Sequence, residues 1–327
     1  MSEASEVVRR PTHLPKPRGP LSERVVAALV DGRPLPDRPA VLDEEDGAIT
    51  LWTIDELSYR GFAEVDDDRE WDPSVVRLRR QLEHDLEARL RARWPGRPAY
   101  DGGVGAFPDA LFAEIEAHEG PSLARYVHTD ATADQVLELL QLRSIYHLKE
   151  SDPVAWVVPR LPVAARASLM ELQYDEYGAG RPEQLHAALF AKGMAALGLD
   201  PTEHAYVDQV PLEVLEQNNA MSLFGLNRRL RGAALGHLAA FEATSSLPSR
   251  RMAQGLERLG LAEEMRAYYL EHVEADAVHE QLAARVICGS LLAEEPELED
   301  DVWLGAFTCL DLEDRLAAHL LDRWGAA

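Results

Sequence analysis

The sequence of 327 residues contains only two cysteines, Cys288 and Cys309. Two cysteines are too few for a disulfide framework or for a zinc site built from thiolates. Basic residues are also scarce, since 33 Lys and Arg stand against 57 Asp and Glu and give a formal net charge of −24. Nucleic acids and anionic membranes bind basic surfaces, so this balance argues against both as partners. The excess of acid is typical of a solvated surface that keeps a protein in solution.

Long apolar runs are absent as well. Residues 1–6 lack the apolar stretch of a signal peptide, and no segment approaches the roughly 18 apolar residues that a membrane span needs. We therefore expect a cytoplasmic protein. There is no internal repeat, and strand-type alternation of apolar and polar residues is nearly absent after residue 106.

The first third of the chain differs in pattern from the rest. Residues 1–20 contain several prolines without apolar periodicity, which predicts a mobile leader. We interpret residues 21–105 as an N-terminal extension of unknown role. Within it the patterns predict helices around Ser22–Leu29 and Asp72–Trp94, a short strand at Ala48–Thr53 and an acidic loop at Glu64–Glu70.

Residues 106–327 read as a succession of amphipathic helices with Pro and Gly at the joints, which predicts an all-α bundle. The candidate helices are Pro108–His118, Ala133–Lys149, Val163–Glu176, Pro182–Ala196, Pro211–Asn218, Asn227–Thr244, Pro248–Leu259, Ala262–Cys288 and Leu310–Trp324.

One predicted helix carries a line of metal-binding residue types. His272, Asp276 and His279 are spaced i, i+4 and i+7 in the helix Ala262–Cys288, so they share its apolar face. Ionisable groups buried on such a face need a partner or a metal ion. A hydrogen-bonded core network is the alternative, and the spacing does not decide between the two.

Acidic residues on other helices complete a candidate site. Glu183 and His186 repeat the carboxylate-x-x-His spacing of Asp276 and His279, although such pairs also arise by chance in a chain this acidic.

Single glutamates end three other predicted helices. Glu176 and Glu242 continue apolar stripes, whereas Glu150 follows a stripe that includes Arg143 and His147 and could lie at the surface. Glutamates from two helices with carboxylate-x-x-His pairs from two others match the design of di-iron carboxylate sites. Zinc or manganese could occupy the same ligands.

Longer strings of these helices resemble the bacterial iron-containing redox enzyme family. The strings are Glu171–His186, Leu148–Pro153, Gly236–Ser246 and Tyr269–His279. The Asp-Glu-Tyr-Gly and His-x3-Asp-x2-His motifs within them are specific, and their order along the chain agrees with the family. The resemblance covers roughly residues 106–290 and leaves the first hundred residues unexplained.

The resemblance implies a haem-oxygenase-like seven-helix bundle that binds two Fe²⁺ ions per chain directly, with no haem. The ligands it implies are Glu150, Glu183, His186, Glu242, His272, Asp276 and His279, with Glu176 as a further carboxylate that only some members use. It implies an O₂-activating oxidase or oxygenase that acts on a small organic acid, amine or amino acid through a peroxo-di-iron intermediate.

Other functions are compatible with the same residues. The protein could be a non-catalytic metal-binding or interaction protein on this fold, or a haem-binding or thiaminase-like enzyme. The last needs a reactive thiol, and Cys288 is better explained as a buried structural one. Tyr174, Tyr177 and Tyr268 lie near the ligands in sequence, although ordinary packing explains each. The substrate is not readable from the sequence, and a homodimer is compatible with it.

Overall fold

The computed structural model describes residues 12–326, except for the side chains of residues 274–277. Every regular element in the described part is a helix, and no strand occurs there. The prediction of an all-α fold is therefore confirmed.

The extension and the bundle are each built from named helices. The extension contains α1 (Pro20–Val30), α2 (Glu44–Glu56), the 3₁₀ helix η1 (Asp67–Trp71) and α3 (Pro73–Arg93). The bundle contains α4 (Phe107–Ala117), α5 (Leu123–Thr129), α6 (Ala133–His147), α7 (Asp152–Ala155), α8 (Val163–Glu176), α9 (His186–Ala196), α10 (Leu212–Leu226), α11 (Arg231–Arg258), α12 (Glu263–Gln281), the π-helical segment η8 (Leu282–Cys288), α13 (Gly289–Glu294) and α14 (Glu299–Arg323). Single 3₁₀ turns join them at η2 (Gly103–Ala106), η3 (Val158–Arg160), η4 (Gly178–Gly180), η5 (Pro182–Gln184), η6 (Val207–Gln209), η7 (Arg228–Leu230) and η9 (Pro296–Leu298).

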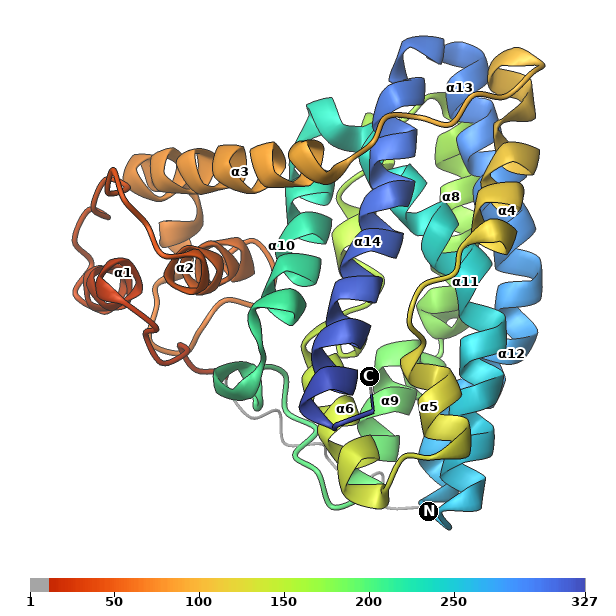
Figure 1. Ribbon diagram of the computed structural model, residues 1–327. Coiled ribbons are helices and arrows are strands. Elements are labelled where there is room, and N and C mark those ends of the chain that lie inside the picture. The colour runs from red at the N-terminus through yellow and green to blue at the C-terminus, as the bar shows by residue number, and fades with distance from the viewer. Residues whose placement is uncertain (1–11, 327) are drawn as a thin grey trace.

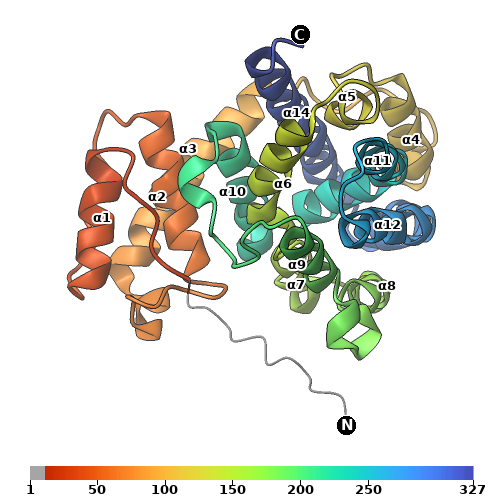
Figure 2. The same ribbon diagram turned by 90° about the horizontal axis from the view of Figure 1, so that it is seen from below.

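The helices of the bundle run side by side, and the extension lies to one side of them (Figure 1). Seen from below, α10 stands between α1–α3 and the remaining bundle helices (Figure 2). The long helix α11 packs against both α12 and α14. All three helices contribute buried residues to the apolar core.

Two glycines allow α11 and α14 to touch through their backbones. A Cβ atom added at Gly236 of α11 would lie 1.8 Å from the carbonyl oxygen of Val302, and one added at Gly305 of α14 would lie 1.9 Å from that of Ala233. No side chain fits at either position without separating the helices. The glycines thus set the distance between the two longest helices of the bundle.

The predicted strand at Ala48–Thr53 is wrong, because these residues form the middle of α2. Asp43 caps the helix by accepting hydrogen bonds from the amides of Glu45 and Asp46. Thr50 and Thr53 donate to carbonyls one turn earlier. All residues from Ala48 to Glu56 are buried, so the β-branched residues reflect burial on every side of a helix rather than a strand.

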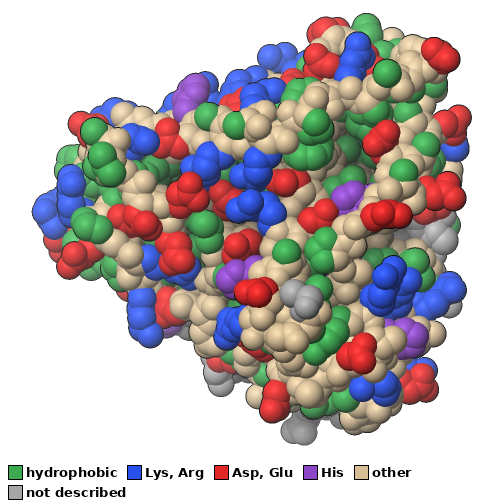
Figure 3. All heavy atoms as spheres, in the orientation of Figure 1, with side chains coloured by type: hydrophobic (Ala, Val, Ile, Leu, Met, Phe, Trp, Pro, Cys, Tyr) green, Lys and Arg blue, Asp and Glu red, His purple; other side chains and the backbone are tan. Residues whose placement is uncertain are grey.

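Arginines of α3 join the extension to the bundle. Arg89 pairs with the buried Glu216 of α10 at 3.1 Å, and Arg93 pairs with Asp311 of α14 at 2.8 Å. Arg91 contacts Asp301 at the start of α14 at 3.2 Å. Basic side chains gather over this part of the surface among acidic ones (Figure 3). The acidic bundle therefore receives compensating charge from the extension.

The described part of the predicted leader is held against the protein. Thr12 Oγ1 donates to the carbonyl of Gly61 at 2.7 Å, and the amide of Lys16 donates to Asp208 at 2.8 Å. Arg18 donates to the carbonyl of Val207 at 3.0 Å. The prediction of a mobile leader over residues 1–20 therefore does not hold for residues 12–20. Residues 1–11 lie outside the described part of the chain.

Two predicted helix boundaries also differ. A break was expected before Pro248, but α11 continues through it and packs against α12 and α14. The helix predicted from Pro182 begins only at His186, because residues 178–184 form two tight turns. In the described part of the chain, no helix combines the length and the apolar character that crossing a bilayer requires.

Candidate metal centre

Six buried side chains form two adjoining groups inside the bundle. The first group is Glu150, His186 and His272, and the second is Glu176, Glu242 and His279. Within each group, one potential ligand atom per residue lies within 4.8 Å of the others. Glutamate oxygens and imidazole nitrogens are the ligands that non-haem iron takes in proteins.

Glu176 connects the two groups. Its Oε2 lies 3.0 Å from Nδ1 of His186, and its Oε1 lies 3.3 Å from Nδ1 of His279. One carboxylate thus presents an oxygen to a histidine of each group. Glu242 Oε2 approaches the same nitrogen of His279 at 3.6 Å.

A tight loop between α8 and α9 places Glu176 beside His186. Gly178 has φ +69°, and a Cβ there would lie 2.5 Å from the backbone of Gln184, so the chain folds back on itself at this glycine. Ala179 follows with φ 52°, an unusual value for a residue other than glycine. The last residue of α8 and the first of α9 therefore face each other.

The carboxylate of Glu150 is oriented by its neighbours. Tyr268 of α12 donates its hydroxyl to Oε2 at 2.9 Å, and Nδ1 of His147 contacts the same oxygen at 3.0 Å. The other oxygen, Oε1, faces His186 Nδ1 at 3.7 Å and His272 Nε2 at 3.6 Å. Tyr268 and His147 thus hold Oε2 in place, and Oε1 points toward the two histidines of the first group.

Helix α12 supplies a histidine to each group. Nδ1 of His272 lies 2.8 Å from the carbonyl of Tyr268, which accepts a hydrogen bond from it and leaves Nε2 directed toward Glu150. Nε2 of His279 lies 3.5 Å from Asp175, which leaves Nδ1 directed toward Glu176 and Glu242. Contacts of this kind, made through the second ring nitrogen, orient histidines at metal sites.

The electrostatics of the cluster favour bound positive charge. Burial raises the pKa of Glu176, but contacts with His186 and His279 outweigh it and lower the pKa to about 2. Burial lowers the pKa of His279, but Glu176 and Glu242 outweigh it and raise the pKa to about 11. Burial and the charge of Glu176 raise the pKa of Glu242. The carboxylates thus hold protons on the neighbouring imidazoles, and metal ions would replace those protons.

Buried atoms without a well-oriented hydrogen bond indicate that these residues fit metal ions. Glu150 Oε1, His186 Nδ1 and His279 Nδ1 are buried and lie 3.0–3.7 Å from oppositely charged groups, but none of them makes a hydrogen bond of good geometry among the described residues. Buried polar atoms without a partner are costly, and here they converge on the two groups. Metal ligation is the interaction that this set of donors can make.

The structure brings together six of the eight residues predicted as ligands. Glu183 is not among them, because it lies in η5 with an exposed side chain, one turn before α9 begins. The predicted carboxylate-x-x-His pair with His186 fails because no helix spans both residues. Asp276 lies on α12, but its side chain is outside the described part of the chain. Glu150, whose burial the sequence left open, is 8% exposed.

The tyrosines singled out from the sequence have different environments. Tyr268 is 1% exposed and contacts Glu150, whereas Tyr174 is 58% exposed. Tyr177 donates its hydroxyl to Asp152 at 2.5 Å. Cys288 is buried as expected, and its thiol donates to the carbonyl of Leu235.

A cavity adjoins the two groups. Glu150, Glu176, Glu242 and His272 line it together with further polar residues and with apolar ones, among them Phe224. Its space, counted to the mouth and including open solvent, is about 620 Å³.

Comparison with known proteins identifies a family and solved structures of similar fold. A family model described as an iron-containing redox enzyme matches residues 137–314, a range that includes all eight predicted ligands. Among solved structures, the chain is similar to a CADD-like protein of unknown function from Nostoc punctiforme, with 15% sequence identity and a TM-score of 0.47. The similarity covers 74% of this chain and 98% of that chain. No curated protein matches the sequence.

Proposed function

The chain belongs to the iron-containing redox enzyme family, and from this premise we propose that it is a non-haem di-iron oxidase or oxygenase that uses O₂ to oxidise a small organic molecule. The observation that carries the proposal is the position of Glu176, which offers one carboxylate oxygen to His186 and the other to His279. A carboxylate shared in this way is suited to hold two metal ions side by side.

The two groups would each hold one ion. Glu150, His186 and His272 would bind the first, and Glu242 and His279 the second, with Glu176 between them. Asp276 stays a ligand predicted from the sequence. Two ferrous ions, when bound, would supply the electrons and the open positions that O₂ reduction requires.

The residues of the chain itself orient, shield and neutralise the site. Tyr268 and His147 fix the plane of the Glu150 carboxylate, so that Oε1 keeps its direction toward His186 and His272. Three glutamates balance the charge of divalent cations inside a low-dielectric core. Apolar residues of the cavity, such as Phe224 and Leu238, exclude water from a substrate beside the centre.

A non-catalytic metal-binding protein is the second candidate. It would use the same six residues, but it would have no need of a cavity beside them. The lining of this cavity by Glu150, Glu242 and His272 together with apolar residues favours an enzyme.

Anaerobic reconstitution tests the proposal. The purified protein is loaded with Fe²⁺, its iron content is counted, and O₂ consumption is then followed with and without small acids and amines. We expect close to two irons per chain and O₂ consumption that depends on iron. Stable iron binding without O₂ consumption under any condition would support the non-catalytic candidate, and failure to bind iron would contradict both.

A further inference from the structure

One turn of the chain lies between the extension and the candidate metal centre. Residues 148–151 connect α6, which ends at His147, to α7, which begins at Asp152. Glu150, a member of the first group, belongs to this turn and to no helix. A side chain on a turn is placed less precisely than one on a helix, where a ladder of backbone hydrogen bonds fixes the chain. The position of Glu150 therefore depends on how its neighbours in the turn are held.

Lys149, directly before Glu150, is held by the extension. Its ammonium pairs with Glu56 of α2. The same Nζ lies 4.5 Å from the centre of the Tyr59 ring and 5.9 Å from that of Trp52. A buried cation enclosed by an anion and by aromatic rings has a narrow range of favourable positions. The extension thus fixes the side chain that precedes the ligand candidate.

Glu56 is itself fixed from two sides. Its Oε1 faces Lys149, and its Oε2 lies 2.9 Å from Nε2 of His204. Stability alone explains a buried pair of this kind poorly, because the cost of removing both charges from water offsets much of their attraction. What the pair does supply is a defined position for Lys149 relative to α2.

The next residues of the chain contact the other group. Ser151 donates its hydroxyl to Oε2 of Glu176 at 3.1 Å, and the same oxygen faces Nδ1 of His186 at 3.0 Å. Asp152 accepts the hydroxyl of Tyr177, the residue after Glu176, at 2.5 Å. A displacement of the turn would therefore reach the carboxylate that faces both groups as well as the first group itself.

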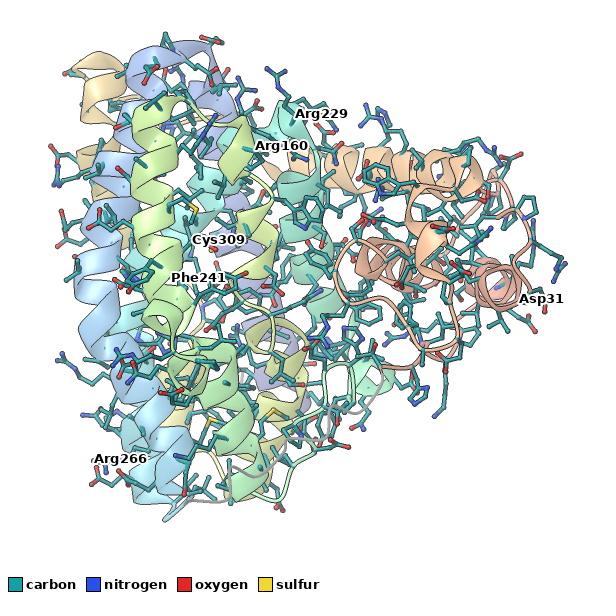
Figure 4. The ribbon with its side chains drawn as sticks, turned by 180° about the vertical axis from the view of Figure 1, so that it is seen from behind. Asp31, Arg160, Arg229, Phe241, Arg266 and Cys309 are labelled. Carbon is teal, nitrogen blue, oxygen red and sulfur yellow. The ribbon has the colours of Figure 1, made fainter. Side chains whose placement is uncertain are left out.

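Helix α10 holds the far end of the turn and also contacts the extension. A Cβ atom added at Gly225 of α10 would lie 2.3 Å from the carbonyl oxygen of Pro153, so the two backbones touch there. Arg160 donates to the carbonyl of Gly225 at 2.5 Å, and Figure 4 shows it next to α10, with the extension beyond. Asn219 of the same helix donates to the carbonyl of Ala48 in α2 at 2.8 Å. The extension thus supports the turn both directly and through α10.

We propose that the N-terminal extension is part of the scaffold of the metal centre. Glu56 is a positioning residue, which acts through Lys149 on the turn that carries Glu150 and so sets the affinity of the first group for its metal ion. The extension contributes no residue to either group. The inference goes beyond the proposed reaction, since it requires metal binding but no O₂ chemistry.

Metal titration of a paired substitution tests the proposal. Glu56→Gln together with Lys149→Met removes both charges at once, so no buried charge is left without a partner. Fe²⁺ is titrated into the metal-free protein under nitrogen by calorimetry, and the two binding steps are fitted separately. We expect the wild type to bind two ions, and the double variant to bind one of them about tenfold or more weakly, as is usual when a contact behind a metal ligand is lost.

A matched control removes a different ion pair of the extension. Asp37→Asn together with Arg77→Met eliminates an exposed pair that does not contact the turn. This double variant should bind both ions with the wild-type affinities. Urea denaturation of the metal-free proteins checks that each variant is folded.

Two substitutions of Tyr59 separate positioning from general stability. Tyr59→Leu removes the ring beside the ammonium of Lys149, whereas Tyr59→Phe keeps the ring and loses only the hydroxyl contact with Ser222 at 3.1 Å. The leucine variant should bind the same ion about threefold or more weakly, and the phenylalanine variant should bind it as the wild type does. This comparison decides the question also if the paired substitution of Glu56 and Lys149 unfolds the protein.

Three results would overturn the proposal. They are wild-type affinities in the double variant of Glu56 and Lys149, equal weakening of both ions there, and equal binding by the two Tyr59 variants. Because the titration uses no O₂, a protein that meets these expectations but consumes no O₂ contradicts the proposed function only.

Discussion

Lys149, the residue directly before Glu150, forms a buried ion pair with Glu56 of α2. Their side chains are 4% and 1% exposed, and Nζ of Lys149 also lies 4.5 Å from the centre of the Tyr59 ring. The extension therefore supplies the counter-ion for a residue adjoining the candidate metal centre. His204, with its Nε2 2.9 Å from Glu56, closes the cluster on the bundle side.

Glu56→Gln should destabilise the protein strongly. Removing one partner of a buried pair leaves the other charge without compensation, which costs about 3–5 kcal/mol. Urea denaturation of the metal-free protein measures the change. The control is Glu64→Gln, which breaks the exposed pair with His13 and should cost less than about 1 kcal/mol. Equal effects of the two substitutions would show that Lys149 does not depend on Glu56.

Glu176→Gln should lower the iron content of the reconstituted protein by half or more. The amide keeps the shape of the side chain but loses the charge that faces both His186 and His279. Iron per chain is determined after anaerobic loading and desalting. Glu171→Gln, an exposed position on the same helix, is the control and should keep the wild-type content. Full iron binding by the Glu176 variant would refute a bridging position for this carboxylate.

Glu183→Gln should leave iron binding unchanged, whereas His186→Ala should reduce it. Glu183 is exposed in η5, while His186 is 4% exposed and faces Glu150 and Glu176. The two variants are compared by iron content and by circular dichroism, which checks that both are folded. If the Glu183 variant lost iron, the ligand set implied by the sequence would hold in place of the one derived from the structure.

Gly236→Ala should lower the free energy of unfolding by about 1–3 kcal/mol or more, because the new Cβ would collide with the carbonyl of Val302. Gly289→Ala is the matched control. Gly289 is helical, and a Cβ added there meets no atom within 4 Å, so alanine should be neutral or stabilise by up to about 1 kcal/mol. Chemical denaturation gives both values. A neutral Gly236 variant would show that α11 and α14 can separate freely.

The stability of the protein should depend on the protonation of His237. Burial lowers its pKa in the folded state to about 4 from an ordinary value of 6.5. Between these values the unfolded state binds the proton and the folded state does not, so this residue makes folding less favourable as the pH falls from 6.5 to 4. It has no such effect above 6.5, and its effect is complete below 4.

The pH dependence is measured by comparing unfolding free energies of the wild type and His237→Gln at several pH values. The wild type should lose stability relative to the variant as the pH falls, by at most about 1.4 kcal/mol per pH unit. His84→Gln, at an exposed position of α3, controls for the loss of a histidine as such. A constant difference between pH 7 and pH 4.5 would mean that His237 is not held neutral.

The sequence by itself determined the helical class and the histidines of α12. A helix repeats every 3.6 residues, so His272 and His279 share a face wherever the helix packs, and their position among apolar residues is readable without a structure. The same holds for Glu176 and Glu242, which continue apolar stripes of their own helices. These inferences rely only on residues within a few turns of each other.

Only the tertiary structure decided what the remaining residues do. Glu183 and His186 have helical spacing, but the turn at Gly178 delays α9 until His186 and leaves Glu183 exposed. Residues 48–53, which include β-branched residues, belong to α2, a helix that is buried on all sides at this point. The pair of Lys149 with Glu56 joins residues 93 positions apart. A local sequence pattern cannot predict such contacts. Their free energy depends on which elements pack together and on how deeply each partner is buried.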